Sequence, residues 1–268
     1  MKKEHVIYYS DPLNDDFAGT NINTQEIPAN FCYLHRSLLW RIATFLVYYV
    51  VAIPLVWLMA KLLLGLKFEN RTVLKRLKKQ GVFLYGNHTQ ILDAYIPPLA
   101  VFPKKGYIAA SPDAVSIPGI RHLVMMLGAL PVPAGVAGMR HFLEAIKTRC
   151  GEASGIAIYP EVHIWPFYTG IRPFSDLSFR YPVICNAPVV AMVTTYRKRK
   201  GLFALCRRPG VTVTFSEPFY PDRSLSPREA QADLCKKVYD FMCEVSASTE
   251  QVEYIRYEQK KAESDDKK

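Results

Sequence analysis

The stretch VFLYGNHTQILD, residues 82–93, decides the fold of this chain. Its first four residues are apolar and predict a short buried strand. Gly86 and Asn87 then predict a tight turn, because both residue types tolerate left-handed backbone angles. The apolar residues 91–99 predict a helix after the turn. A buried strand followed by a turn and a helix is the pattern of a layered α/β domain.

His88 and Asp93 are the polar residues of this stretch that can carry chemistry. Five residues at about 100° each place two helical side chains roughly 140° apart, so the pair can meet only if His88 lies in the turn before the helix. A histidine placed there can remove a proton from an alcohol, while a carboxylate on its other ring nitrogen fixes the tautomer and stabilises the imidazolium. The structural alternative is a capping or core histidine beside an unrelated aspartate.

Composition narrows the class of protein. A chain of 268 residues can bury one sizeable core, and a net charge of +10 indicates an anionic partner such as phospholipid headgroups, nucleic acid or a phosphorylated cofactor. Half of the residues are hydrophobic and 12% aromatic, which favours a membrane surface, and no recognised nucleic-acid-binding module accompanies the charge. The six cysteines lack C-x-x-C spacing and are predicted to be reduced packing residues of an intracellular catalytic domain.

The segment 36–67 is predicted to be a membrane-associated helical segment. Residues 42–60 carry no charge and would extend roughly 28 Å as a helix, about the thickness of a hydrocarbon core. Pro54 would kink one spanning helix or mark the bend of a hairpin that returns near Leu66, and a buried helix of a soluble core is the third possibility. Lysine and arginine are more frequent after the segment than before it, which places the larger C-terminal part on the cytoplasmic face.

Two basic regions follow different patterns. Residues 69–79 would form a short basic helix on the lipid surface or an ordinary solvated face. Residues 196–208 read as a basic loop with an apolar tip, suited to an anionic leaflet or to the phosphates of CoA, or simply solvated. The ends of the chain, 1–35 and 249–268, are predicted to be a loosely ordered polar arm and a charged tail that frays.

Short apolar runs alternate with helical patterns through the catalytic domain, predicted at 68–248. This rhythm predicts a layered mixed sheet flanked by helices, with the site where strands end and helices begin. Ser226 and Pro227 predict the start of a packing helix. The predicted strands are 106–110, 129–133, 155–159, 188–196 and 211–215, with helices at 120–127 and 139–149.

Tyr159-Pro160-Glu161 ends one of these strands, 73 residues after His88. Proline stops the strand's hydrogen bonding, so Glu161 is presented at the sheet edge, beside the His88 turn if the two strands are neighbours. The alternative is a capping or surface glutamate.

Residues 87–93 resemble the first motif, N-H-x-x-x-x-D, of the lysophospholipid and glycerophosphate acyltransferase family, which includes 1-acylglycerol-3-phosphate acyltransferase. Tyr159-Pro160-Glu161 resembles the third motif of that family. The resemblance covers roughly residues 70–220 with its blocks in order. The other similar blocks are 117–120 with 127–132, Arg172-Pro173-Phe174, Phe179 and 186–190.

The resemblance implies a membrane-associated O-acyltransferase that transfers a fatty acyl group from acyl-CoA or acyl carrier protein to a hydroxyl of lysophosphatidic acid or a related lysolipid. His88 would act as the base, Asp93 would orient it, and backbone amides near the turn would stabilise the oxyanion. A thioester is already activated, so neither a covalent enzyme intermediate, a metal nor a cofactor beyond the acyl donor is expected. The residues expected to bind substrate are Asn87, Glu161, Arg140, Arg172 and His163, the last with a structural role against Trp165 as the alternative.

Two departures from the family pattern bear on the substrate. After the second motif the family usually has an arginine, but residues 133–135 contain no basic residue and the first one that follows is Arg140. After the third motif the family usually has small residues and an arginine, which residues 162–166 replace here. These changes suggest a different acceptor. They also leave two other functions open, a catalytically silent protein that binds a lipid surface and a hydrolase that directs water through His88. No P-loop, G-x-S-x-G, H-E-x-x-H or metal-ligand cluster is present, and the oligomeric state stays open.

Overall fold

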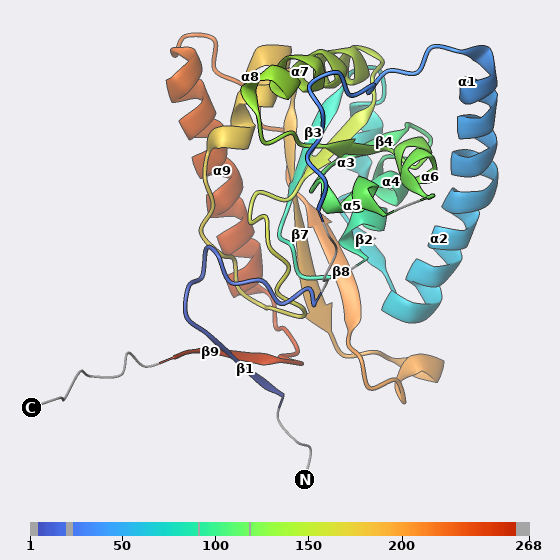
Figure 1. Cartoon of the computed structure of the whole chain (residues 1–268). Helices are drawn as coiled ribbons and strands as arrows, with labels where there is room; N and C mark the ends of the chain where they lie inside the picture. The colour runs from blue at the N-terminus through green and yellow to red at the C-terminus, as the bar shows by residue number, and fades with distance from the viewer. Residues whose placement is uncertain (1–4, 20–23, 91, 118, 261–268) are drawn as a thin grey trace, which may run out of the picture.

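The computed structural model describes residues 5–19, 24–90, 92–117 and 119–260, and its centre is a seven-stranded sheet (Figure 1). The strands are β2 (Lys67–Glu69), β3 (Val82–Gly86), β4 (Gly106–Ala110), β5 (Ala129–Pro131), β6 (Gly155–Ile158), β7 (Val189–Arg197) and β8 (Gly210–Phe215). Their order is β2-β8-β7-β3-β6-β4-β5. Only β7 and β8 are antiparallel neighbours; the other pairs are parallel. The predicted mixed sheet is confirmed, and the strand that carries the His88 turn lies in its middle.

Alternate residues of β3 enter two different hydrophobic cores. Phe83 and Tyr85 pack into the core covered by the C-terminal helices, whereas Val82 and Leu84 pack into the core on the other face. All five residues of the strand are buried. A strand covered on both faces must be apolar throughout, which explains why the run before the turn shows no alternation of polar and apolar residues.

Helices cover both faces of the sheet. The first core contains side chains of α7, α8 and α9, and the second contains side chains of α3, α4 and the N-terminal helix. The helix predicted at Ser226 is confirmed, since its hydroxyl and the Glu229 carboxylate form a capping box. The helices are α3 (Thr72–Arg76), α4 (Ile96–Val101), α5 (Asp113–Ser116), α6 (Arg121–Met126), α7 (Val136–Gly151), α8 (Arg180–Cys185) and α9 (Pro227–Ser248), with 3₁₀ turns η3 (Asp93–Tyr95), η4 (Leu177–Phe179) and η5 (Gly201–Phe203).

Two predicted helices begin later than expected. The basic helix predicted at 69–79 is only α3, because the residues before it form β2 and pair with β8 at the edge of the sheet. The helix predicted at 91–99 is a 3₁₀ turn, η3, followed by α4; residue 91 lies outside the described residues. The turn that carries His88 is therefore longer than the sequence suggested.

The N-terminal helix runs without interruption from Leu38 to Leu64, so of the alternatives left open by the sequence the single helix is confirmed and the hairpin is excluded. It consists of α1 (Leu38–Phe45), the π-helical stretch η1 (Leu46–Ala52), α2 (Ile53–Met59) and a second π-helical stretch, η2 (Ala60–Leu64). Pro54 follows the first π-helical stretch, where the wider turn accommodates a residue without an N–H group. The helix is long and apolar enough to cross a membrane, judged by length and composition.

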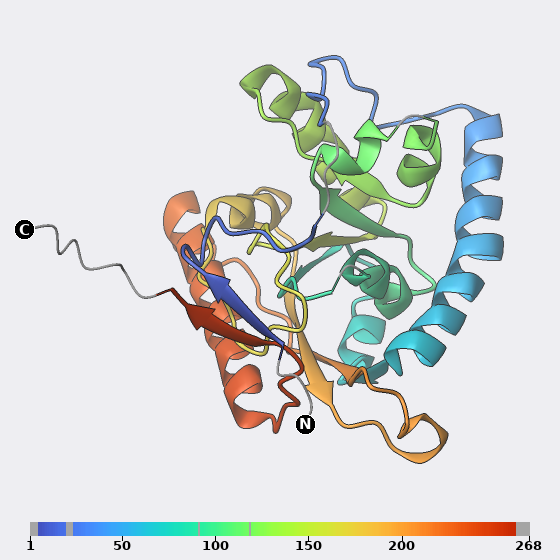
Figure 2. The same ribbon diagram turned by 60° about the horizontal axis from the view of Figure 1, so that its bottom comes forward.

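This helix lies along the side of the domain instead of projecting from it (Figures 1 and 2). Near its middle the Tyr48 hydroxyl accepts a hydrogen bond of 2.8 Å from the backbone N–H of Gly106. Tyr48 and Ala60 are its only buried residues. One stripe of the helix therefore packs on the domain, and the rest of its apolar surface is uncovered.

The described parts of both chain ends are ordered, contrary to the prediction. β1 (Val6–Tyr9) and β9 (Arg256–Gln259) form a separate parallel two-stranded sheet, and residues farther along the N-terminal arm enter the first core, where the Tyr33 hydroxyl donates to Pro131 O at 2.8 Å. Each end is too polar to fold alone. They are ordered because each supplies the pairing partner of the other.

Candidate active site

The His88 turn lies at the carboxyl end of β3, between β6 and β7. Gly86 is required there for space and not for a left-handed backbone, since neither Gly86 nor Asn87 has a positive φ. A Cβ on Gly86 would lie 2.7 Å from Met192 Cε and 2.9 Å from Tyr159 Cε1. A larger residue at position 86 would therefore displace the side chains of Met192 and Tyr159.

His88 and Asp93 are in contact, as the sequence predicted. Nδ1 of His88 lies 3.1 Å from Oδ2 of Asp93, and the histidine side chain is 16% exposed whereas the aspartate is fully buried. The same carboxylate oxygen accepts hydrogen bonds of 2.8 Å from the N–H groups of Thr89 and Gln90. Three groups therefore converge on one oxygen of Asp93, an arrangement that fixes the orientation of the imidazole ring.

Tyr159 contacts both residues of the pair, a role that the sequence did not predict. Its ring stacks on the imidazole of His88 with centroids 4.6 Å apart, and its hydroxyl donates to Asp93 O at 2.7 Å. Burial raises the pKa of Tyr159 well above its ordinary value, so the phenol stays neutral and remains a donor. In the described residues Nε2 of His88 has no hydrogen-bond partner, and it is the nitrogen left free to accept a proton.

The amide groups of the turn are not available as an oxyanion hole. Thr89 and Gln90 donate their N–H groups to Asp93, and His88 donates its N–H to Glu161 Oε2 at 3.1 Å. Each amide already has a carboxylate acceptor, and so the expectation that they stabilise an oxyanion is wrong for these three residues.

Asn87 supports the sheet and does not face a substrate. Its Nδ2 donates to Thr194 O at 3.0 Å, and Thr194 N donates to its Oδ1 at 2.8 Å. Asn87 is buried. Its side chain continues the pairing of β3 with β7 where the backbone turns away, which corrects its predicted role in substrate binding.

Replacing Asn87 with alanine is expected to destabilise the protein by roughly 1–3 kcal/mol for each of the two orphaned groups of Thr194, because both would stay buried without a partner. Urea unfolding measures this change in the free energy of unfolding. Asn14→Ala, which removes an exposed hydrogen bond to Asp11, is the control and should cost far less. A loss no larger than in this control would contradict the proposed support role.

Glu161 lies beside the His88 turn, as predicted from neighbouring strands, but it is buried and fully bonded. Its Oε2 accepts from His88 N, its Oε1 accepts from Arg172 N at 3.0 Å, and it pairs with the Arg172 guanidinium at 3.3 Å. Burial raises the pKa of Glu161 while the guanidinium opposes that rise. Glu161 therefore braces the backbone of His88 and has no free oxygen for an acceptor molecule.

Arg172 also differs from its expected role. Its side chain is 1% exposed, donates to the carbonyl of His163 as well as to Glu161, and lies over the ring of Trp165 with its Cζ 5.0 Å from the ring centroid. It is thus a buried structural cation and not a phosphate ligand. Arg140 is exposed on the first turns of α7, and no described contact joins it to His88.

Residues 162–167, which follow Glu161, are bonded to the turn. Trp165 N donates to His88 O at 3.1 Å, and Phe167 N donates to Thr89 O at 2.9 Å. Val162 and Phe167 both have positive φ, a strained conformation for such side chains. His163 is half-buried with its Nδ1 3.8 Å from Asp16 Oδ2, so it faces the N-terminal arm and not His88.

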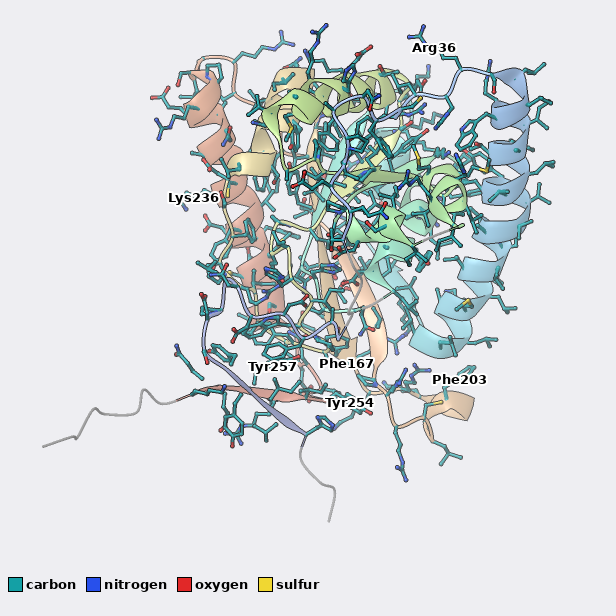
Figure 3. The ribbon with its side chains drawn as sticks, in the orientation of Figure 1. Arg36, Phe167, Phe203, Lys236, Tyr254 and Tyr257 are labelled. Atoms are coloured by element: carbon teal, nitrogen blue, oxygen red, sulfur yellow. The ribbon has the colours of Figure 1, made fainter. Side chains whose placement is uncertain are left out.

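An aromatic cluster connects this segment to both ends of the chain (Figure 3). Trp165 is 1% exposed and donates its indole N–H to Asp15 O at 2.7 Å. The rings of Tyr9 and Tyr257, from β1 and β9, lie 4.7 and 5.0 Å from its ring. The cluster comprises Tyr9, Phe17, Trp165, Tyr168 and Tyr257. In the sequence, the signal for this cluster is the presence of aromatic residues in the two polar arms.

An apolar cavity of about 270 Å³ lies between the N-terminal helix and the segment that follows His88. Its lining includes Leu92, Tyr95 and Ile96 on one side and Val56 and Met59 on the other. Because Asp93 belongs to the same short segment as the first three residues, the cavity lies close along the chain to the histidine pair.

No protein-family model matches the chain, and no curated protein matches it by sequence. Among solved structures it is similar to the 1-acyl-sn-glycerophosphate (LPA) acyltransferase PlsC from Thermotoga maritima, with a TM-score of 0.50 and 18% sequence identity over 80% of this chain and 96% of that one. The chain thus has the fold of the glycerophosphate acyltransferases, which agrees with the motifs in its sequence. At this identity the similarity establishes the fold alone.

Proposed function

We propose that this protein is a membrane-associated O-acyltransferase that uses His88 as its general base. The observation that carries the proposal is the buried Asp93 carboxylate on Nδ1 of His88, while no other described residue hydrogen-bonds to Nε2. In the reaction Nε2 takes the proton of an acceptor hydroxyl as its oxygen attacks the thioester carbonyl of the acyl donor. The tetrahedral intermediate collapses, the C–S bond breaks, and the thiol leaves with a proton returned by the imidazolium.

The apolar cavity suits the acyl chain of the donor or of the product. It borders the uncovered N-terminal helix, so a chain could enter it without crossing water. The donor is acyl-CoA or acyl carrier protein, and the acceptor is lysophosphatidic acid or a related lysolipid. Burial of Arg172 favours an acceptor whose phosphate is bound by another cation, and Arg140, which is exposed on α7, is the candidate.

The N-terminal helix is proposed to lie in the plane of one leaflet. A spanning helix would carry the domain packed along its side into the bilayer, whereas an in-plane helix places its uncovered apolar surface in lipid and leaves the domain in water. The catalytic domain is then on one face of the membrane, proposed to be the cytoplasmic one.

The function is tested by incubating the purified protein, in detergent, with a labelled acyl-CoA or acyl carrier protein and a panel of lysophosphatidic acid, lysophosphatidylglycerol, lysophosphatidylcholine and glycerol 3-phosphate. Labelled acyl lipid supports the proposal and identifies the acceptor. Labelled free fatty acid instead would establish a hydrolase. With neither product, the chain would be a lipid-surface protein that has kept the scaffold without the chemistry.

A further inference from the structure

The loop between β7 and β8, residues 198–209, projects from the domain beside the end of the N-terminal helix (Figures 1 and 2). Its tip exposes two large apolar side chains: Phe203 is 41% exposed and Leu205 is 94% exposed (Figure 3). In water, exposing apolar side chains of this size is unfavourable. We refer to this segment as the β7–β8 loop.

Four exposed cations surround that tip, Lys198, Lys200, Arg207 and Arg208. Within the described residues no hydrogen bond or ion pair holds any of them, whereas Lys236 and Lys237 of α9 are each paired with an aspartate. A cavity of about 730 Å³ between the loop and the helix end is also lined by Lys61 and Lys67. The chemistry of this region suits phosphate groups beside an apolar phase.

Arg199 of the loop and Arg197 at the end of β7 fix this region to the N-terminal helix. Arg199 donates to the carbonyls of Leu62 and Leu63, and Arg197 donates to that of Gly65, the left-handed residue that ends the helix. These carbonyls lack partners within the helix, and a cation at a helix C-terminus is favoured by the helix dipole. The loop tip is thereby held at a set position relative to the uncovered apolar surface of the helix.

That surface extends along the whole helix. Its exposed large apolar residues are Leu38, Leu39, Ile42, Phe45, Leu46, Val50, Val51, Leu55, Trp57, Leu58, Met59, Leu62 and Leu63. Because the loop is bonded to Leu62 and Leu63, its apolar tip lies at the end of this surface, and the unpaired cations lie at the border between the two.

We propose that the β7–β8 loop is a second membrane contact, which directs the protein to a bilayer of anionic phospholipid. Phe203 and Leu205 enter the headgroup region while the four cations bind lipid phosphates, in the manner of a basic segment beside an inserted helix. The proposal rests on the lipid association of the N-terminal helix proposed above, but not on acyl-transfer chemistry.

Vesicle flotation tests the proposal with the full chain. Vesicles of phosphatidylcholine alone are compared with vesicles of equal parts phosphatidylcholine and phosphatidylglycerol at low salt. The variant Lys200→Gln, Arg207→Gln, Arg208→Gln is expected to bind the anionic vesicles about 100-fold more weakly, since each cation near such a surface contributes roughly a fivefold gain. Its binding to the neutral vesicles should stay within about twofold of the wild type, because the cations lack anionic partners there.

The matched control removes the same charge from α9 through Arg228→Gln, Lys236→Gln and Lys237→Gln, on the side of the molecule opposite the N-terminal helix (Figure 3). This control should bind the anionic vesicles nearly as the wild type does. Leu205→Asp should weaken binding to both kinds of vesicle, because it removes the apolar tip. Equal binding by the loop variant and the α9 variant would overturn the proposal, as would equal losses of the loop variant from neutral and anionic vesicles.

Failure of this proposal is distinguishable from failure of the proposed function. Acyl transfer by the wild type is assayed in detergent, where no bilayer is present, whereas flotation requires no turnover. Near-ultraviolet circular dichroism confirms that each variant is folded.

Discussion

Replacing His88 with alanine is expected to lower the rate of acyl transfer by about 10²–10⁴-fold, the range that a general base contributes. The imidazole is held by the Asp93 carboxylate on Nδ1, which leaves Nε2 to act as the base. Without it the acceptor hydroxyl would attack the thioester with its proton still bound. The measurement is the initial rate of labelled acyl-lipid formation at saturating donor and acceptor.

The fold should survive this change. The His88 side chain is partly exposed, and among the described residues it hydrogen-bonds only to Asp93. The bonds to the backbone of the turn come from Glu161, Trp165 and Phe167 and remain. Asp93→Asn is the comparison that tests the pair: its amide can donate to Nδ1, which leaves the proton on Nε2, so a loss comparable with that of His88→Ala is expected. Turnover by His88→Ala within about tenfold of the wild type would contradict the mechanism.

Replacing Arg172 with alanine is expected to lower the free energy of unfolding by about 3–5 kcal/mol, the usual effect of removing one partner of a buried ion pair. Glu161 would stay behind as a buried carboxylate without its cation. The guanidinium is also the group that opposes the rise of the Glu161 pKa caused by burial, so that pKa would rise further in the variant. Urea unfolding at neutral pH measures the loss.

The double variant Glu161→Gln, Arg172→Met separates charge from packing. Removing both charges avoids the unpaired carboxylate, and a glutamine oxygen can still accept from His88 N, so the double variant should be more stable than Arg172→Ala. Arg172→Ala would also loosen the turn, because Arg172 connects Glu161 to the carbonyl of His163. A destabilisation below about 1 kcal/mol, typical of an exposed pair, would contradict the structural role of Arg172.

Local patterns in the sequence were sufficient for the central strand and for the contact between His88 and Asp93. The spacing of His88 and Asp93 allowed contact only with the histidine outside the helix, and the two side chains do meet in that way. The apolar run before them formed a strand buried on both faces. Such predictions succeed because strand burial and turn geometry depend mainly on residues close together in the chain.

The roles of Asn87, Glu161 and Arg172 were not predictable in the same way. The family motif indicated that these residues belong to the site, but their partners are Thr194, the His88 backbone and the His163 carbonyl. A buried polar group must bond to whatever donor or acceptor the fold brings near it. The sequence shows that these residues are polar, but it does not show whether a polar side chain binds substrate or supports the backbone of the site.

By itself, the sequence determined the class of fold, six of the seven strands of the central sheet, the histidine pair and an apolar helical segment before the sheet. Only the tertiary structure decided that the helix is single and lies along the domain, that the chain ends pair with each other, and that Trp165 connects them to the His88 turn. The first set depends on periodicity and spacing within short segments. The second depends on contacts between segments far apart in the chain, which no local pattern encodes.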